Sequence, residues 1–189
     1  DKLIDAAEKF FAERDAVPIV RIVHSDVVAL GSIAEIDCAL ELRGYEKKAP
    51  TLTMLLDLSG AVEIKTSLEN GSIEKVDARS WLQAWYAFTN RNMEEINVHN
   101  APLEKSDFRH LFLLKKGFDE APMSSGMAVY ANQAMGLFGI STAIGQREKG
   151  HALDIINSLL CWGFAKGSRF AYLQVEEANS MAVNLYQKL

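Results

Sequence analysis

The residues best suited to chemistry are the seven from Gln146 to Ala152, which mix basic side chains with a glycine between a predicted strand and a predicted helix. Backbone N–H groups in such a turn converge on an anion, and the first turn of the helix adds the positive end of its dipole. Gly150 lets the backbone approach a phosphate closely, and Ala152 leaves the first helical turn unobstructed. The segment therefore predicts a cradle for a diphosphate.

Rival chemistries fail on the same residues. Gly145 and Gly150 have the glycine spacing of a Walker loop, but His151 and Ala152 stand where the lysine and the Ser/Thr are required. No G-x-G-x-x-G follows a predicted strand, and no G-x-S-x-G elbow is present. The remaining histidines lack metal-ligand spacing, so no metal site is expected.

The cradle lies within a predicted α/β unit. Two strands precede it and a helix follows it, with Gly167 placed to end that helix in the left-handed conformation. A third strand and a last helix complete the unit. In chain order the predicted elements are strand Gly126–Ala131, strand Ala134–Ile144, the helix with apolar positions from Leu153 to Phe164, strand Phe170–Val175 and helix Ala178–Leu189.

Upstream, apolar periodicity predicts further elements around an irregular stretch. The stretch from Val98 to Pro122 contains Pro102 and Gly117 and is predicted to be a loop region or a substrate-side insertion. Before it we predict helix Leu3–Arg14, strand Val17–Val23, helix Ile33–Leu42, a β-rich run Thr51–Leu58 and a helix that carries Trp81, Trp85 and Phe88 on one face.

The pattern Arg147-x-x-Gly150-x-Ala152 resembles the Q/R-x-x-G-x-G/A acetyl-CoA loop of the GNAT superfamily of N-acetyltransferases. The segment from Tyr172 to Leu189 is similar to that family's next strand and helix, so the resemblance covers about Ser125 to Leu189. It implies an α/β (α+β) fold with a mixed sheet flanked by helices. By this resemblance we expect the last one or two strands of the family's sheet to be missing from this sequence, through truncation or disorder.

The resemblance also implies roles for individual residues. The strand before the loop splays from the next parallel strand and pairs with the pantetheine arm through the backbone of Phe138, Gly139, Ile140, Ser141 and Thr142. The pyrophosphate is expected on the backbone amides of Arg147, Glu148, Lys149, Gly150, His151 and Ala152, with no role for the His151 side chain.

Three side chains downstream are given roles, each with a simpler alternative. Tyr186 matches the tyrosine that protonates the leaving thiolate, and its alternative is helix packing. Asn179 matches a residue that contacts the cofactor arm or orders the loop, and its alternative is a helix N-cap. Glu176, at the end of a strand, is a candidate base for the incoming amine.

The first helix and strand also match the later ones at a constant offset, with Phe11 on Phe164 and Val20 on Leu173. This resembles tandem GNAT proteins. Leu40 stands where the Tyr186 hydroxyl would be, and no cradle loop precedes Leu3, so the chain is expected to begin inside a degenerate first half. We assign residues 1–75 to that half and residues 76–189 to an acetyl-CoA-binding GNAT domain.

Composition limits the partners. Hydrophobic residues make up 49% of the chain, charged residues 24%, and the net charge of -5 argues against a nucleic-acid binder. No apolar run reaches the roughly 18 to 20 residues that span a bilayer, and no signal peptide is visible. Cys38 and Cys161 are expected to be buried, unpaired thiols, rather than a disulfide or a reactive thiol, in a cytoplasmic monomer or homodimer.

Together these observations predict an N-acetyltransferase that uses acetyl-CoA as co-substrate and moves the acetyl group to a primary amine of a small molecule or peptide by direct attack. One alternative is a non-catalytic acyl-CoA-binding regulatory module that kept the cradle and lost the chemistry. Transfer to a hydroxyl stays open as well.

Overall fold

The computed structural model describes residues 2–23, 30–60 and 72–189, which divide into two compact units, residues 1–48 and 49–189. The first unit holds α1 (Lys2–Ala12) and α2 (Leu30–Glu41). Arg43 bonds to Asp5 and Glu8 of α1, with N–O distances of 2.6 and 2.9 Å. Leu40 is buried.

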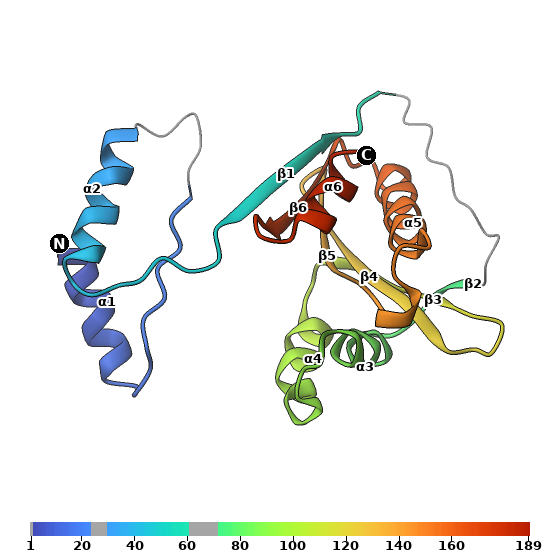
Figure 1. Cartoon of the computed structure of the whole chain (residues 1–189), viewed down its shortest axis with the longest axis horizontal. Coiled ribbons are helices and arrows are strands. Elements are labelled where there is room, and N and C mark those ends of the chain that lie inside the picture. The colour runs from blue at the N-terminus through green and yellow to red at the C-terminus, as the bar shows by residue number, and fades with distance from the viewer. Residues whose placement is uncertain (1, 24–29, 61–71) are drawn as a thin grey trace. The chain divides into compact units, whose positions relative to one another are not determined.

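The second unit is one six-stranded mixed sheet with helices on both faces (Figure 1). The strand order is β1-β6-β5-β4-β3-β2, and only β5 and β6 run parallel. The strands are β1 (Thr51–Asp57), β2 (Ser72–Lys75), β3 (Arg109–Lys116), β4 (Pro122–Ala131), β5 (Ala134–Thr142) and β6 (Phe170–Glu176). The helices are α3 (Ala78–Thr89), α4 (Ile96–Lys105), α5 (His151–Ala165) and α6 (Ser180–Tyr186), with short 3₁₀ turns η1 (Met93–Glu95) and η2 (Ile144–Gln146).

Each face of the sheet has its own core. On one face, α5 buries Ile155, Ile156 and Leu159 against β3, β4 and β5, and α6 adds Ala182 and Val183 to the same apolar cluster. Gly163 lets α5 approach β5, because a Cβ there would overlap the Met135 side chain. Figure 1 shows α3 and α4 on the opposite face, where the apolar cluster centres on Trp81, Leu82 and Tyr86.

Most predicted elements are confirmed within a few residues, and Gly167 ends α5 with φ +85°, as expected. Two predictions of secondary structure are wrong. The stretch from Val98 to Pro122 holds most of α4 and all of β3, because Pro102 is tolerated inside α4 and Pro122 opens β4, a position where a strand needs no donor.

The segment 17–23, predicted to be a strand, has no regular secondary structure. A strand needs a hydrogen-bonded neighbour, and no backbone partner for residues 17–23 lies among the described residues. The prediction of buried thiols is also wrong for Cys38, which is exposed, whereas Cys161 is half-buried; both are free.

The boundary between the two compact units falls at 48/49, because β1 and β2 belong to the sheet of the second unit. β1 pairs antiparallel with β6 over seven residues, from Thr51–Glu176 to Asp57–Phe170. The sheet therefore continues beyond β6 with a strand from the N-terminal side of the chain. Among the described residues, no helix is long and apolar enough to cross a membrane.

Candidate active site

The two parallel strands of the sheet separate part of the way along. β5 and β6 pair at Ala134–Phe170, Met135–Ala171 and Gly136–Tyr172, and no later residues of the two strands pair. Beyond this point β5 stays bonded to β4, and β6 stays bonded to β1. The facing backbone edges of residues 137–142 and 173–176 are left open to a ligand, which is the splay that the family resemblance implies.

A β-bulge bends β5 just past the parting point. The register passes from Met127–Phe138 to Ser125–Ser141, so β5 carries one residue more than β4. Gly139 takes φ +56° there, and the Ser125 hydroxyl donates to its carbonyl over 3.3 Å. A Cβ on Gly139 would overlap the Trp81 ring, so glycine is needed for both conformation and space.

The loop after β5 presents unused backbone donors. The N–H of Gln146 donates to Ala143 (2.8 Å) and that of Arg147 to Ile144 (3.5 Å), whereas no hydrogen bond from the N–H groups of residues 148–152 occurs within the described part of the chain. Glu148 (φ +63°) and Gly150 (φ +83°) both turn the backbone through the left-handed region. Gly150 is also the N-cap of α5, and no side chain caps the helix there. The free N–H groups therefore lie at the positive end of the helix dipole.

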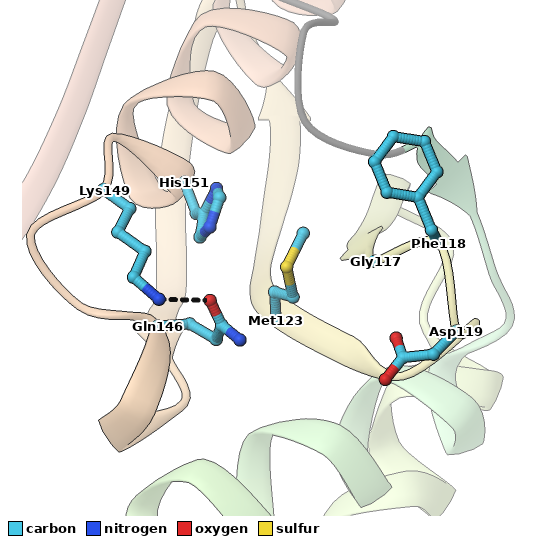
Figure 2. Close-up of a pocket in the computed structure, with 7 residues that line it drawn as sticks. All are labelled: Gly117, Phe118, Asp119, Met123, Gln146, Lys149 and His151. Carbon is cyan, nitrogen blue, oxygen red and sulfur yellow. Dashed lines mark hydrogen bonds between the residues drawn. The ribbon is translucent and has the colours of Figure 1, made fainter.

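The basic side chains of the loop fold back on it. Lys149 Nζ donates to the Gly145 carbonyl (2.9 Å) and to Gln146 Oε1 (3.0 Å), the second of which is drawn in Figure 2. Arg147 Nε donates to the Thr142 carbonyl over 3.4 Å. Both cationic side chains are thus tied to the backbone beside the free amides, which favours an anionic ligand there.

An open cavity of about 550 Å³ adjoins the loop. Figure 2 shows Gln146, Lys149 and His151 along one side of it and the turn between β3 and β4 along the other, with Met123 between. His151 is buried, and its Nδ1 has no hydrogen-bond partner among the described residues. Burial lowers the pKa of His151, the charges of Lys115 and Lys149 lower it further, and Asp154 opposes them.

A buried ion pair that the sequence reasoning missed supports the start of α5. Lys115 of β3 bonds to Asp154 of α5, with side-chain exposures of 1% and 12%. The pair neutralises a carboxylate one turn inside the helix, where an uncompensated charge would repel a bound anion. The sequence carries one sign that Lys115 is buried: it follows the core residues Leu111 and Leu113 at every second position of the strand, so it lies on the same face of the sheet.

Tyr186 lies at the narrow end of the splay. With Leu137, Leu173 and Leu160 it lines an apolar cavity of about 280 Å³ between the sheet and α6. Burial raises the pKa of the Tyr186 hydroxyl above its ordinary value. The hydroxyl therefore stays protonated at neutral pH, as a proton donor requires.

The other two predicted side chains lie at the wide end. Glu176 is exposed, four residues beyond Tyr172 along β6, about 13 Å at the rise of a strand. Glu176 lies on one face of the sheet and Tyr186 packs against the other, so the structure does not bring these two side chains together. Asn179 is the N-cap of α6, and its Oδ1 accepts from the N–H of Ala182 over 3.2 Å.

No model of a known protein family matches the sequence, and no curated protein does. Solved structures do match. A tandem GNAT protein from the clavulanic acid biosynthesis pathway aligns with a TM-score of 0.70 and 12% identity over 98% of this chain and 64% of its own. A GCN5-related N-acetyltransferase from Sphaerobacter thermophilus aligns with a TM-score of 0.62 and 14% identity over 77% of this chain.

The aminoglycoside N-acetyltransferase AAC(6')-Iy in complex with CoA aligns with a TM-score of 0.50 and 19% identity, over 62% of this chain and 84% of its own. This chain spans about half the length of the Sphaerobacter protein, 49%. At these identities the comparisons establish the fold, which is that of the GNAT acetyltransferases.

Proposed function

We propose that the protein is an N-acetyltransferase that moves an acetyl group from acetyl-CoA to a primary amine of a small molecule or peptide. The observation that carries the proposal is the coincidence of two features: β5 and β6 part after Gly136–Tyr172, and the free N–H groups of residues 148–152 lie where β5 leads into α5. The first admits an extended thioester arm and the second binds a diphosphate. Acetyl-CoA carries both.

The donor site follows from these features. The backbone from Phe138 to Thr142 would pair with the pantetheine arm as an added strand. The amides of residues 148–152 would hold the pyrophosphate, with Arg147 and Lys149 beside it. Asn179, already occupied as the cap of α6, would contribute by fixing the turn between β6 and α6.

In the proposed reaction, the neutral amine nitrogen attacks the thioester carbonyl carbon. Backbone N–H groups near Phe138 to Ile140 stabilise the negative oxygen of the tetrahedral intermediate. The C–S bond then breaks, Tyr186 protonates the departing sulfur, and the amine proton passes through water to Glu176. The products are the acetamide and CoA with a free thiol.

Tyr186→Phe tests the chemistry apart from the binding, because the ring stays and only the hydroxyl leaves. We expect kcat to fall about 10²- to 10⁴-fold, the usual contribution of a general acid. The dissociation constant for acetyl-CoA, measured by calorimetry against CoA and ATP, should change little. Unchanged kcat in the variant would remove Tyr186 from the mechanism.

The regulatory alternative is separated by the same protein preparation. Acetyl-CoA is supplied with a panel of amines, polyamines, peptides and alcohols, and free thiol is measured. Turnover with amines supports the proposal, and turnover with alcohols alone would reassign the acceptor. Acetyl-CoA binding without turnover on any acceptor would make the chain a non-catalytic acyl-CoA-binding module.

For the N-terminal region we propose a remnant of a first GNAT-like half, residues 1–75, without catalytic groups of its own. The alignment of a tandem GNAT protein over 98% of this chain supports a tandem arrangement. We also propose that the protein is cytoplasmic and is a monomer or a homodimer.

A further inference from the structure

One part of the sheet exposes apolar side chains on the face that α3 and α4 cover elsewhere. β6 alternates strictly, with Ala171, Leu173 and Val175 buried under α5 and α6. Its other side chains face outward, and two of these are aromatic. The exposed apolar residues on this face of β1, β5 and β6 are Leu55 (74%), Phe138 (37%), Phe170 (45%) and Tyr172 (36%).

Two of these rings meet at the point where the strands part. Phe138 comes from β5, Tyr172 comes from β6, and their centroids lie 6.1 Å apart in an edge-to-face arrangement. Gly136, the last β5 residue paired with β6, makes room for them, because a Cβ there would lie 2.5 Å from Phe138 Cε2 and 2.8 Å from Tyr172 Cζ. We call Phe138 and Tyr172 the platform.

A second aromatic group borders the same stretch of β5. Trp85 of α3 stacks on Trp81, with ring centroids 5.5 Å apart and planes 7° apart. A Cβ on Gly139 would lie 3.4 Å from Trp85 Nε1, so this indole stands beside the bulge. The bulge, where the thioester carbonyl is proposed to lie, is thus next to the platform on one side and to Trp85 on the other.

On this face the charged side chains of the three strands have one sign, and the cation nearest to the bulge that the contacts record is Arg91, whose guanidinium lies 4.5 Å over the Trp85 ring. In the described strands β1, β5 and β6, the side chains that share the face of Tyr172 include no lysine or arginine, and the charged ones are Asp57 and Glu176. Carboxylates attract an ammonium group, and ring faces tolerate it through cation–π contact. Aromatic rings without polar partners also favour a planar apolar body.

From these observations we propose that the platform binds the acceptor and that the acceptor is an amine carried on an aromatic or other bulky apolar body, of the arylalkylamine class. The inference rests on the proposed acetyl transfer. Phe138 and Tyr172 would hold the apolar body, and the amine would reach the bulge at Gly139. Tyr186, on the other face of the sheet, would remain on the side of the leaving sulfur.

The test measures kcat/KM by thiol release with phenethylamine, putrescine and glucosamine at saturating acetyl-CoA. We expect phenethylamine to exceed both other amines by roughly tenfold or more, the usual effect of one well-packed aromatic group. Tyr172→Ala should raise KM for phenethylamine by a similar factor. It should leave the acetyl-CoA dissociation constant unchanged.

Phe170→Ala is the matched control, since Phe170 lies on the same face of the same strand, two residues on the paired side of the parting point. We expect it to keep the preference for phenethylamine. Acetyl transfer with equal or better activity on putrescine or glucosamine would overturn the inference and leave the proposed function standing. So would equal losses in both variants, or a change in oligomeric state with unchanged KM. No transfer to any amine would instead reject the proposed function.

Discussion

Gly150→Ala is the most direct test of the diphosphate cradle. The residue has φ +83°, and a Cβ would meet nothing within 4 Å, so the substitution adds conformational strain without a clash. An L-residue in the left-handed region costs about 1–2 kcal/mol. In a chain of this size each kcal/mol lowers Tm by about 2–4 °C.

Binding should suffer beyond this loss of stability. If the strain is relieved by rotation of residue 150, the N–H groups of residues 148–152 no longer converge. A hydrogen bond to a charged group contributes about 1.5–3 kcal/mol. The loss of one such bond raises the dissociation constant of acetyl-CoA about 10- to 150-fold, at 1.4 kcal/mol per tenfold.

Gly167→Ala is the control, because Gly167 ends the same helix with φ +85° and equally open space at its Cβ position. Thermal unfolding should register a similar loss of Tm in both variants. Isothermal calorimetry with acetyl-CoA should register a loss of affinity only in Gly150→Ala. Equal losses of Tm with unchanged affinity in both variants would refute the idea that this glycine shapes an anion site.

Two further predictions concern the residues behind the cradle. Lys115→Met leaves the Asp154 carboxylate without its buried cation, so the free energy of unfolding, measured in urea, should fall by about 3–5 kcal/mol. Adding Asp154→Leu should recover much of this loss. If the double variant recovers none of it, the broken ion pair is not the cause of the loss. Burial and the charges of Lys115 and Lys149 lower the pKa of His151 below 6.5, against the opposing effect of Asp154, so the unfolded chain binds the proton more readily. The stability that this shift contributes is complete above pH 6.5 and is lost as the pH falls from there through the lowered value. His151→Gln should therefore flatten the decline of Tm between about pH 7 and 5, and a decline of the same steepness would contradict the assignment.

The sequence is sufficient to predict the elements that are encoded by neighbouring residues. The loop, α5 and its left-handed end at Gly167 are encoded within about twenty residues, and the predicted strands on either side lie where expected. The parting of the strands was predicted only through the family resemblance. Gly139 is a local indication of the β-bulge in β5, but the position of the bulge depends on how β5 pairs with β4.

The features that were not predicted correctly have one cause in common: each depends on residues that are distant in the sequence. Lys115 is stable in the core only because Asp154, 39 residues away, faces it. The segment 17–23 has strand composition but no described partner, whereas β1, of similar composition, finds β6 more than a hundred residues away. Propensity gives the tendency to extend, and pairing alone decides whether a strand forms.

β1 also bears on why the donor cleft stays open. β6 forms seven residue pairs with β1 and only three with β5, so its position is fixed mainly from the outer edge. Residues 173–176 can then keep their inner backbone groups free for water or a ligand without loss of the strand. A strand from the N-terminal side of the chain therefore stabilises the parted arrangement of β5 and β6. On the proposed function, β1 therefore contributes to the donor site without supplying a catalytic group.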